Sequence, residues 1–388
     1  MGQQCLEHIL SKWVHDTVYH DVKLKQCFKV IKTILNICVD WHKPFTFTAR
    51  DIRLASNKKI SNSIAHTVIN DLLSINHTEI NHDLIAPEDN LERSIYSRPL
   101  IKYQDRYIFM NPSLCGHGII HAFFDIMRNY LIGKNIYFDR VVGKHVESMV
   151  IDKLKANGLT PVFGNYTYNK ELQECDMIIE GSDTIAFFEI KKRVLSFNSL
   201  SGKPLDILFD LSKSLIQSIR QALNHEVVLR KNGRIELASP NGTYNIIFNN
   251  RRVVIVSVSL LDFGSLSYHP CSRHILQSYY HHGFEFTDDS TDAEKTEYRA
   301  KLEGTNKEGE KLRNIYNELL SIENTYSRSP LFSHCLFLSI PQLFTILEEC
   351  KSNDDLLKRV IRCMSVVSSS MDFYVDHDHF GKIYQKTE

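Results

Sequence analysis

The sequence lacks the features that would place it in a specialised class of protein. Its 388 residues include only 16 glycines and 10 prolines, and the chain contains no internal repeat and no low-complexity run. Lys+Arg and Asp+Glu both total 46, so the formal net charge is zero. This balance, with 43% hydrophobic residues, excludes a mainly disordered chain, a collagen-like repeat and a polybasic nucleic-acid coat. Any attraction for a polyanion must therefore be local.

Paired cysteines and long apolar runs are also lacking. The nine cysteines are scattered and never form a Cys-x-x-Cys pair, which favours reduced thiols over a disulfide framework. No window approaches the roughly 20 continuous apolar residues of a membrane span. The first residues lack the basic region and uninterrupted apolar run of a secretory signal. We expect a soluble, cytoplasmic protein with no membrane partner.

The N-terminal part reads as helices followed by a hairpin. Apolar spacing predicts two helices before about residue 40. Thr48 can cap a short helix, and Ser61 or Ser63 can cap a second one. A β-hairpin is expected between Leu100 and Phe109. This order resembles a winged helix over residues 44–112, whose partner could be DNA or another protein because the second helix carries few basic residues.

The central part predicts an α/β sandwich core. A helix is followed by three strands, a second long helix and a continuous apolar strand of the kind buried inside a sheet. A tight turn at Gly181–Asp183 joins the second strand to the third. The expected elements, in chain order, are a helix at 143–159, strands at 160–168, 174–180 and 184–194, a helix at 205–231 and a strand at 251–261.

The C-terminal part is acidic. Residues 284–325 hold 11 acids and 6 bases, which predicts a solvated helical excursion with a loop at Gly304–Gly309. One more strand and a helix after Pro341 should pack on the core, and the residues beyond about 372 read as a loose tail. The expected divisions are a helical segment at 1–43, a winged-helix-like domain at 44–115, a core at 140–283, the excursion with the final strand and helix at 284–372, and the tail at 373–388.

Two neighbouring strands carry the candidate site. Glu189 and Lys191, two residues apart, project from the same face of one strand, and the hairpin can bring Asp176 beside Glu189. Converging carboxylates repel each other, and Mg²⁺ relieves this because it prefers oxygen ligands. The ion can activate water and clamp phosphoryl oxygens, while Lys191 can stabilise developing negative charge. The alternative is a structural ion pair between Glu189 and Lys191 in a buried strand.

The ordered set of Glu147 in GKHVESMV, Asp176 in ECDMIIE, and Glu189 with Lys191 in FFEIKKR resembles the PD-(D/E)XK nuclease superfamily over about residues 140–262. The resemblance implies an α/β (α+β) restriction-endonuclease-like core, with a mixed central sheet flanked by helices. It implies that the three acids bind Mg²⁺, with Mn²⁺ as a substitute, and that the lysine acts in hydrolysis. A glutamine on the following helix, Gln217 or Gln221, often completes such a site. Two departures stand out: Cys175 occupies the place of the motif's proline, and SFNSLSGKPLD lengthens the gap to Gln217.

The expected function is a Mg²⁺-dependent DNA endonuclease of repair, restriction or defence type. Residues 141–260 hold 15 Lys+Arg and 12 Asp+Glu, a local charge of 15 − 12 = +3. The alternative function is a non-catalytic nucleic-acid-binding or assembly protein with a degenerate nuclease fold, and a homodimer or a partner subunit stays open. Basic residues that could contact phosphates, or form a solvated basic edge, are Lys192, Arg193, Arg230, Lys231, Arg251 and Arg252.

Overall fold

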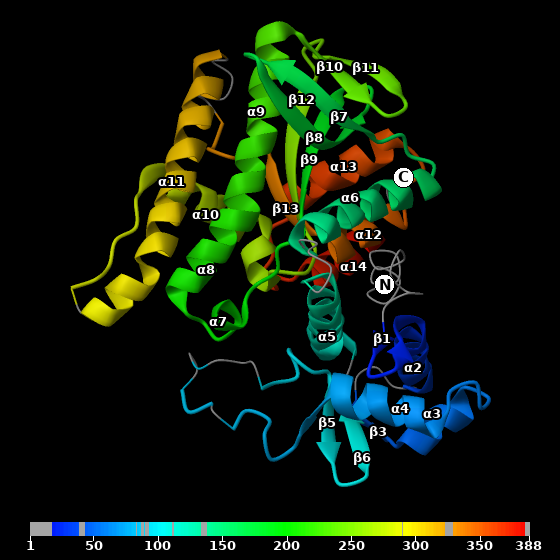
Figure 1. Cartoon of the computed structure of the whole chain (residues 1–388). Coiled ribbons are helices and arrows are strands. Elements are labelled where there is room, and N and C mark those ends of the chain that lie inside the picture. Colours follow the sequence, from blue (N-terminus) through cyan, green and yellow to red (C-terminus); the bar gives the residue numbers. More distant parts are fainter. Residues whose placement is uncertain are drawn as a thin grey trace. The chain divides into compact units, whose positions relative to one another are not determined.

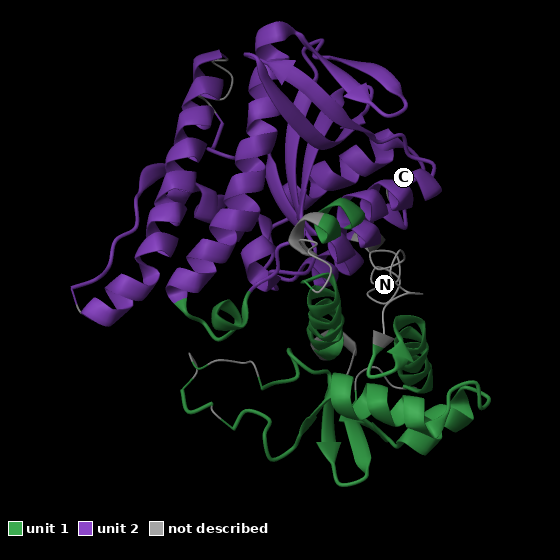
Figure 2. Cartoon of the chain, in the orientation of Figure 1, with its two compact units in different colours: residues 1–145, 196–203 green, residues 146–195, 204–388 purple. Residues whose placement is uncertain are grey.

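The chain forms two compact units (Figure 2). Unit 1 comprises residues 1–145 with 196–203, and unit 2 comprises residues 146–195 with 204–388. None of the helices in the described ranges has the length and apolar character that a bilayer crossing requires. The computed structural model describes residues 18–38, 43–82, 84–86, 89, 93–110, 112–132, 138–288, 290–322 and 329–384.

Unit 1 is built on helices and a four-stranded sheet of order β3-β6-β5-β4. The expected cap is confirmed, because the Thr48 side chain accepts from the backbone N–H of Asp51 at the start of α3. Ser61 likewise caps α4 by accepting from the N–H of Ile64. The elements are β1 (Val18–Tyr19), β2 (Val22–Lys23), α2 (Leu24–Ile37), β3 (Phe45–Phe47), α3 (Ala49–Ala55), α4 (Asn62–His66), η1 (Thr67–Leu73), β4 (Ser74–Asn76), β5 (Leu100–Tyr103), β6 (Arg106–Phe109), α5 (Pro112–Ile132) and α7 (Phe197–Leu200).

The expected hairpin of unit 1 is also confirmed. Strands β5 and β6 pair antiparallel, with Leu100 opposite Phe109 and Tyr103 opposite Arg106. The helices α3 and α4 therefore precede a hairpin in the chain, which is the order expected of a winged-helix-like pattern. The first predicted helix lies largely outside the described residues, and β1 and β2 form a small antiparallel pair just before α2.

Unit 2 contains a seven-stranded mixed sheet of order β11-β10-β7-β8-β9-β12-β13. Strands β7, β8 and β9 form an antiparallel meander, whereas β12 lies parallel to β9 and to β13. The apolar strand β12 thus lies inside the sheet, between β9 and β13, as expected. The strands are β7 (Val162–Tyr168), β8 (Glu171–Glu180), β9 (Thr184–Lys191), β10 (Arg234–Ser239), β11 (Gly242–Ile247), β12 (Arg252–Ser259) and β13 (Cys335–Ser339).

Helices cover both faces of this sheet (Figure 1). Helix α9 packs against β9 and β12 and is itself covered by α11, while α12 and α13 lie on the other side. Helix α6 begins in unit 1 and ends in unit 2. The helices are α6 (Phe138–Ala156), α8 (Pro204–Leu211), η2 (Ser212–Ile216), α9 (Gln217–Asn232), η3 (Gly264–Ser267), α10 (His269–His281), α11 (Asp292–Ile322), α12 (Ile340–Leu347), α13 (Asn353–Ser365) and α14 (Phe373–Tyr384).

Two expectations for the C-terminal part are wrong. No loop interrupts the acidic segment at Gly304–Gly309, because α11 is continuous. A Cβ atom at Gly309 would lie 3.2 Å from the Tyr279 carbonyl oxygen, so this glycine allows close approach of α10 rather than a break in the helix. The tail beyond residue 372 begins as α14, whose first amides at Tyr374 and Val375 donate to the Asp372 carboxylate.

Candidate active site

The meander holds the two strand acids side by side. In the antiparallel β8–β9 ladder, Met177 lies opposite Phe188. Asp176 comes just before Met177 and Glu189 just after Phe188, so the two acids are adjacent across the strands. Asp176 Oδ2 accepts a hydrogen bond from the Ile190 backbone N–H at 2.9 Å, which fixes the carboxylate against β9. The sequence therefore places Asp176 and Glu189 together because a short turn and an antiparallel register leave them no other arrangement.

Lys191 lies between the two carboxylates. Its Nζ is 3.2 Å from Glu189 Oε2 and 3.9 Å from Asp176 Oδ2. The Glu189 side chain is 2% exposed, the Asp176 side chain 9% and the Lys191 side chain 21%. Lys191 is thus the group of the three that reaches furthest toward solvent.

A third acid contributes to this cluster. Burial, the charge of Glu189 and the charge of Glu147 raise the pKa of Asp176 well above its ordinary value of 3.8, against the opposing effect of Lys191. Glu147 also helps to raise the pKa of Lys191. The structure thus brings Glu147, Asp176, Glu189 and Lys191 into one electrostatic cluster. Two of these carboxyl groups, Asp176 and Glu189, lie within 4 Å of the same lysine.

The charges within the cluster are unequal. Burial alone would raise the pKa of Glu189, but the hydrogen bond from His225 and the charge of Lys191 lower it below its ordinary value. Burial likewise opposes the charge on Lys191, and the carboxylates Glu189 and Asp176 outweigh it and raise the lysine's pKa. Glu189 and Lys191 therefore form an ion pair, while Asp176 retains its proton to a higher pH.

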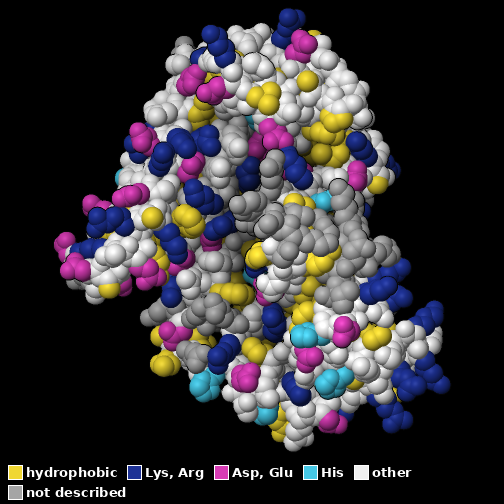
Figure 3. Space-filling model, viewed as in Figure 1, with side chains coloured by type: hydrophobic (Ala, Val, Ile, Leu, Met, Phe, Trp, Pro, Cys, Tyr) yellow, Lys and Arg dark blue, Asp and Glu magenta, His cyan; other side chains and the backbone are white. Residues whose placement is uncertain are grey.

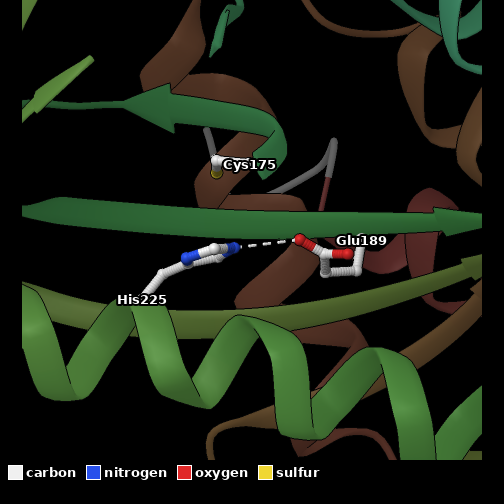
Figure 4. Close-up of side chains that lie close together, drawn as sticks. All are labelled: Cys175, Glu189 and His225. Atoms are coloured by element: carbon white, nitrogen blue, oxygen red, sulfur yellow. Dashed lines mark hydrogen bonds and ion pairs between the residues drawn. The ribbon is translucent and has the colours of Figure 1, made fainter. Parts of the chain in front are cut away.

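His225 on α9 is a site residue that the sequence did not reveal. Its Nε2 lies 3.1 Å from Glu189 Oε1 (Figure 4). Its Nδ1 lies 2.7 Å from the Tyr166 hydroxyl. A carboxylate only accepts, so Nε2 carries the proton, and in the neutral ring Nδ1 accepts from Tyr166. All three side chains are buried. A chain of two hydrogen bonds thus fixes one oxygen of Glu189 and leaves Oε2 to Lys191.

A second group of side chains that could hold a metal ion overlaps with the carboxylate cluster. Ligand atoms of Cys175, Glu189 and His225 all lie within 4.8 Å of one another (Figure 4). Burial and the nearby Glu189 raise the pKa of the Cys175 thiol well above its ordinary value, so an ion bound there would have to displace the thiol proton. Both ring nitrogens of His225 are engaged in hydrogen bonds. The oxygen-rich set is the better candidate for an ion.

Gln221, rather than Gln217, shares the face of α9 that carries His225 one turn later. The Gln221 Oε1 atom is buried and has no hydrogen-bond partner among the described residues. Gln217 is half-buried, and no hydrogen bond of the described part of the chain joins it to the cluster. Because residues four apart lie on one face of a helix, the position of Gln221 in the sequence could have indicated that His225 faces the same way.

The basic residues near the site are mostly committed to acids. The clearest case is Arg230, whose side chain is 6% exposed and lies 2.8 Å from the fully buried Glu226, four residues earlier on α9. Such a pair stabilises the fold and is not available to phosphates. The other pairs are Arg193 with Asp210 at 2.7 Å, Lys231 with Glu318 at 2.5 Å, and Arg251 with Glu180 at 2.6 Å.

Two basic residues have a different environment. Arg252 begins β12 and is exposed, so it is open to a polyanion. Lys192 directly follows Lys191 in the sequence, and its ammonium group is buried. Of the six basic residues, Arg252 is thus the best placed for contact with an exposed phosphate.

A partly open pocket of about 70 Å³ lies elsewhere in unit 2. It is lined by β13, α10 and the C-terminal helices, including Leu338, His269, Arg362 and Phe373. Neither Asp176 nor Glu189 borders it. The carboxylate cluster therefore does not belong to a small-molecule pocket of this kind.

Comparisons of the chain with protein-family models, with curated proteins and with solved structures return no match. The functional assignment therefore depends on the residues and their geometry.

Proposed function

We propose that the chain is a divalent-metal-dependent nuclease that hydrolyses phosphodiester bonds in DNA. The observation that carries this proposal is the convergence of Asp176 and Glu189 on Lys191 at the end of β9, with Glu147 near enough to act on the pKa of Asp176 and of Lys191. A buried acid with a strongly shifted pKa beside specific charge partners is a feature of functional sites.

The fold supports the proposal. Helix α6, strands β7 to β9, helix α9 and strand β12 follow one another as the resemblance to PD-(D/E)XK nucleases implies, in a mixed sheet flanked by helices. Each motif residue lies on the expected element, with Glu147 on α6, Asp176 on β8 and both Glu189 and Lys191 on β9. This order of elements supports the proposal at the level of secondary structure.

The donor set fits a hard divalent cation. Carboxylate oxygens of Asp176, Glu189 and Glu147 are ligands that Mg²⁺ and Mn²⁺ prefer. Burial first, and then the charges of Glu189 and Glu147, raise the pKa of Asp176, and a cation bound beside it would offset both effects. A bound ion would supply Lewis-acid activation of water and of a phosphoryl oxygen.

The protein's own groups have separable tasks. Tyr166 and His225 hold Glu189 in one orientation, and the Ile190 amide holds Asp176. Lys191 is anchored by both acids and is the most solvent-accessible of the three, so its ammonium can meet the negative charge that develops on phosphorus oxygens. The rigid anchors keep these groups in place without rearrangement during the reaction.

A titration of Mg²⁺ and of Mn²⁺ against supercoiled plasmid and linear duplex tests the function. We expect cleavage that rises with either ion and stops with EDTA. If the plasmid is nicked and no nucleotides are removed from the ends of the linear duplex, the activity is that of an endonuclease. Absence of cleavage with both ions and both substrates would favour the alternative, a non-catalytic protein in which Lys191 only neutralises buried acids.

Metal binding should depend on pH. The proton that Asp176 retains must leave when an ion binds, so below the raised pKa the affinity should rise with pH, by at most about tenfold per unit. Above the raised pKa the affinity should level off. Calorimetry with Mg²⁺ in buffers of different ionisation enthalpy would count the released protons. Affinity that falls with rising pH would contradict this assignment.

A further inference from the structure

Unit 1 contains a strongly basic segment within a chain of zero net charge. Residues 23–59 hold nine Lys+Arg and two Asp+Glu, so the local charge is 9 − 2 = +7. This exceeds the +3 of residues 141–260, in which the candidate active site lies. Residues 23–59 thus carry more net positive charge than the segment that holds the candidate active site.

Helix α2 presents a row of lysines. Its apolar side, including Leu24, Phe28 and Ile31, is buried in unit 1. Lys25, Lys29 and Lys32 are exposed at spacings of four and three residues, which puts them along one side of the helix over about 10 Å. No acid lies within α2 to neutralise them.

Helix α3 and the turn after it add a second group of cations. Arg50, Lys58 and Lys59 are exposed, and Arg53 is half-exposed. The one acid of α3, Asp51, accepts from the Thr48 N–H at 2.8 Å and so serves the helix cap. Its charge is held at the helix N-terminus, where it offsets little of the positive charge of the turn.

The two groups form one surface, because α2 packs against α3. Figure 3 shows Lys and Arg side chains gathered over these helices with few acids among them. None of the group's side chains forms an ion pair with another described residue. We call this surface the basic face, and its members are Lys23, Lys25, Lys29, Lys32, Arg50, Arg53, Lys58 and Lys59.

We propose that the basic face binds the phosphate backbone of double-stranded DNA. A row of unpaired lysines on a rigid helix can replace the counterions condensed on a duplex. An anionic membrane is a poorer fit, because amphipathic helices bind bilayers through their apolar side and that side of α2 is buried in the unit's core. The choice of DNA over other polyanions rests on the proposed nuclease function.

This contact carries no base specificity. The helix that a winged helix would place in the major groove, α4 continued by η1, contains no Lys or Arg over residues 62–73. Phosphate contacts position a protein on DNA, whereas base contacts determine the sequence that it recognises. The basic face would therefore hold duplexes of any sequence with similar affinity.

Salt dependence of DNA binding tests the proposal. The probe is a fluorescein-labelled 30-base-pair duplex, bound by the full chain in EDTA so that no cleavage occurs, and the affinity is measured by anisotropy from 50 to 200 mM KCl. If Lys25, Lys29 and Lys32 each contact a phosphate, the triple change to Gln should make the negative slope of log K against log[salt] shallower by about 2 to 3. The matched control is Lys170→Gln with Lys351→Gln and Lys358→Gln, three exposed lysines of unit 2.

The outcomes separate the partners and the two proposals. Equal loss of affinity in both triple variants would overturn the assignment, because only net charge would matter. Binding to phosphatidylserine vesicles without binding to the duplex would also overturn it, in favour of a membrane. Mg²⁺-dependent cleavage is scored separately, so the nuclease proposal can fail while duplex binding persists, and the reverse.

Discussion

Asp176→Asn should reduce metal-dependent DNA cleavage by at least about 10²-fold and leave the thermal unfolding temperature unchanged or higher. The asparagine oxygen can still accept from the Ile190 amide, but it cannot bind an ion as an anion. Because burial and the charge of Glu189 raise the pKa of Asp176 and so disfavour its ionised form, the neutral amide should not destabilise the folded state. Plasmid cleavage and thermal unfolding of the same preparation provide the measurements.

The control for this variant is Glu171→Gln, an exposed acid on the same strand. It removes the same charge from β8 and should leave cleavage unchanged. Lys191→Ala should also abolish cleavage, since it removes the one cation that both acids contact. Undiminished, metal-dependent activity in Asp176→Asn and in Lys191→Ala would rule out this site.

His225→Ala should lower the free energy of unfolding by about 3 kcal/mol. The substitution leaves Glu189 Oε1 without its partner at a position where the carboxylate is almost fully buried. Urea unfolding followed by circular dichroism measures the loss. We also expect weaker Mn²⁺ binding, because Glu189 is then free to rotate and its pKa rises.

A double-mutant cycle isolates this interaction. Glu189→Gln makes the buried group neutral, so the cost of His225→Ala should be smaller in that background. Tyr166→Phe removes only the outer hydrogen bond and should cost about 1 kcal/mol. Additive effects of His225→Ala and Glu189→Gln would show that the histidine does not act through the carboxylate.

The candidate site was predictable where the chemistry is local in the sequence. Glu189 and Lys191 share a face because side chains alternate along a strand, and a three-residue turn brings Asp176 across from them. His225 was not predictable in this way, because its contact with Glu189 spans 36 residues and depends on how α9 crosses the sheet. The alternation of side chains along a strand determines which residues of that strand share a face. The packing of a helix on the sheet determines which helix residue contacts them.

The same limit applies to charge. Sequence counts treat Arg230 and Lys29 alike, yet Arg230 is buried against Glu226 and Lys29 stands on an acid-free helix face. The spacing of four between Glu226 and Arg230 was a local signal for their pairing. Pairs between distant segments, such as Lys231 with Glu318, have no such signal. Glycine content likewise suggested a loop in α11, where Gly309 instead permits helix packing.

A crystal structure of the protein soaked in Mn²⁺ and measured at the manganese absorption edge tests the central proposal most directly. We predict one anomalous peak about 2 Å from oxygens of both Asp176 and Glu189, with the Lys191 ammonium close by. No such peak at saturating Mn²⁺, or a peak only between Cys175 and His225, would contradict a carboxylate-held metal site and with it the nuclease assignment.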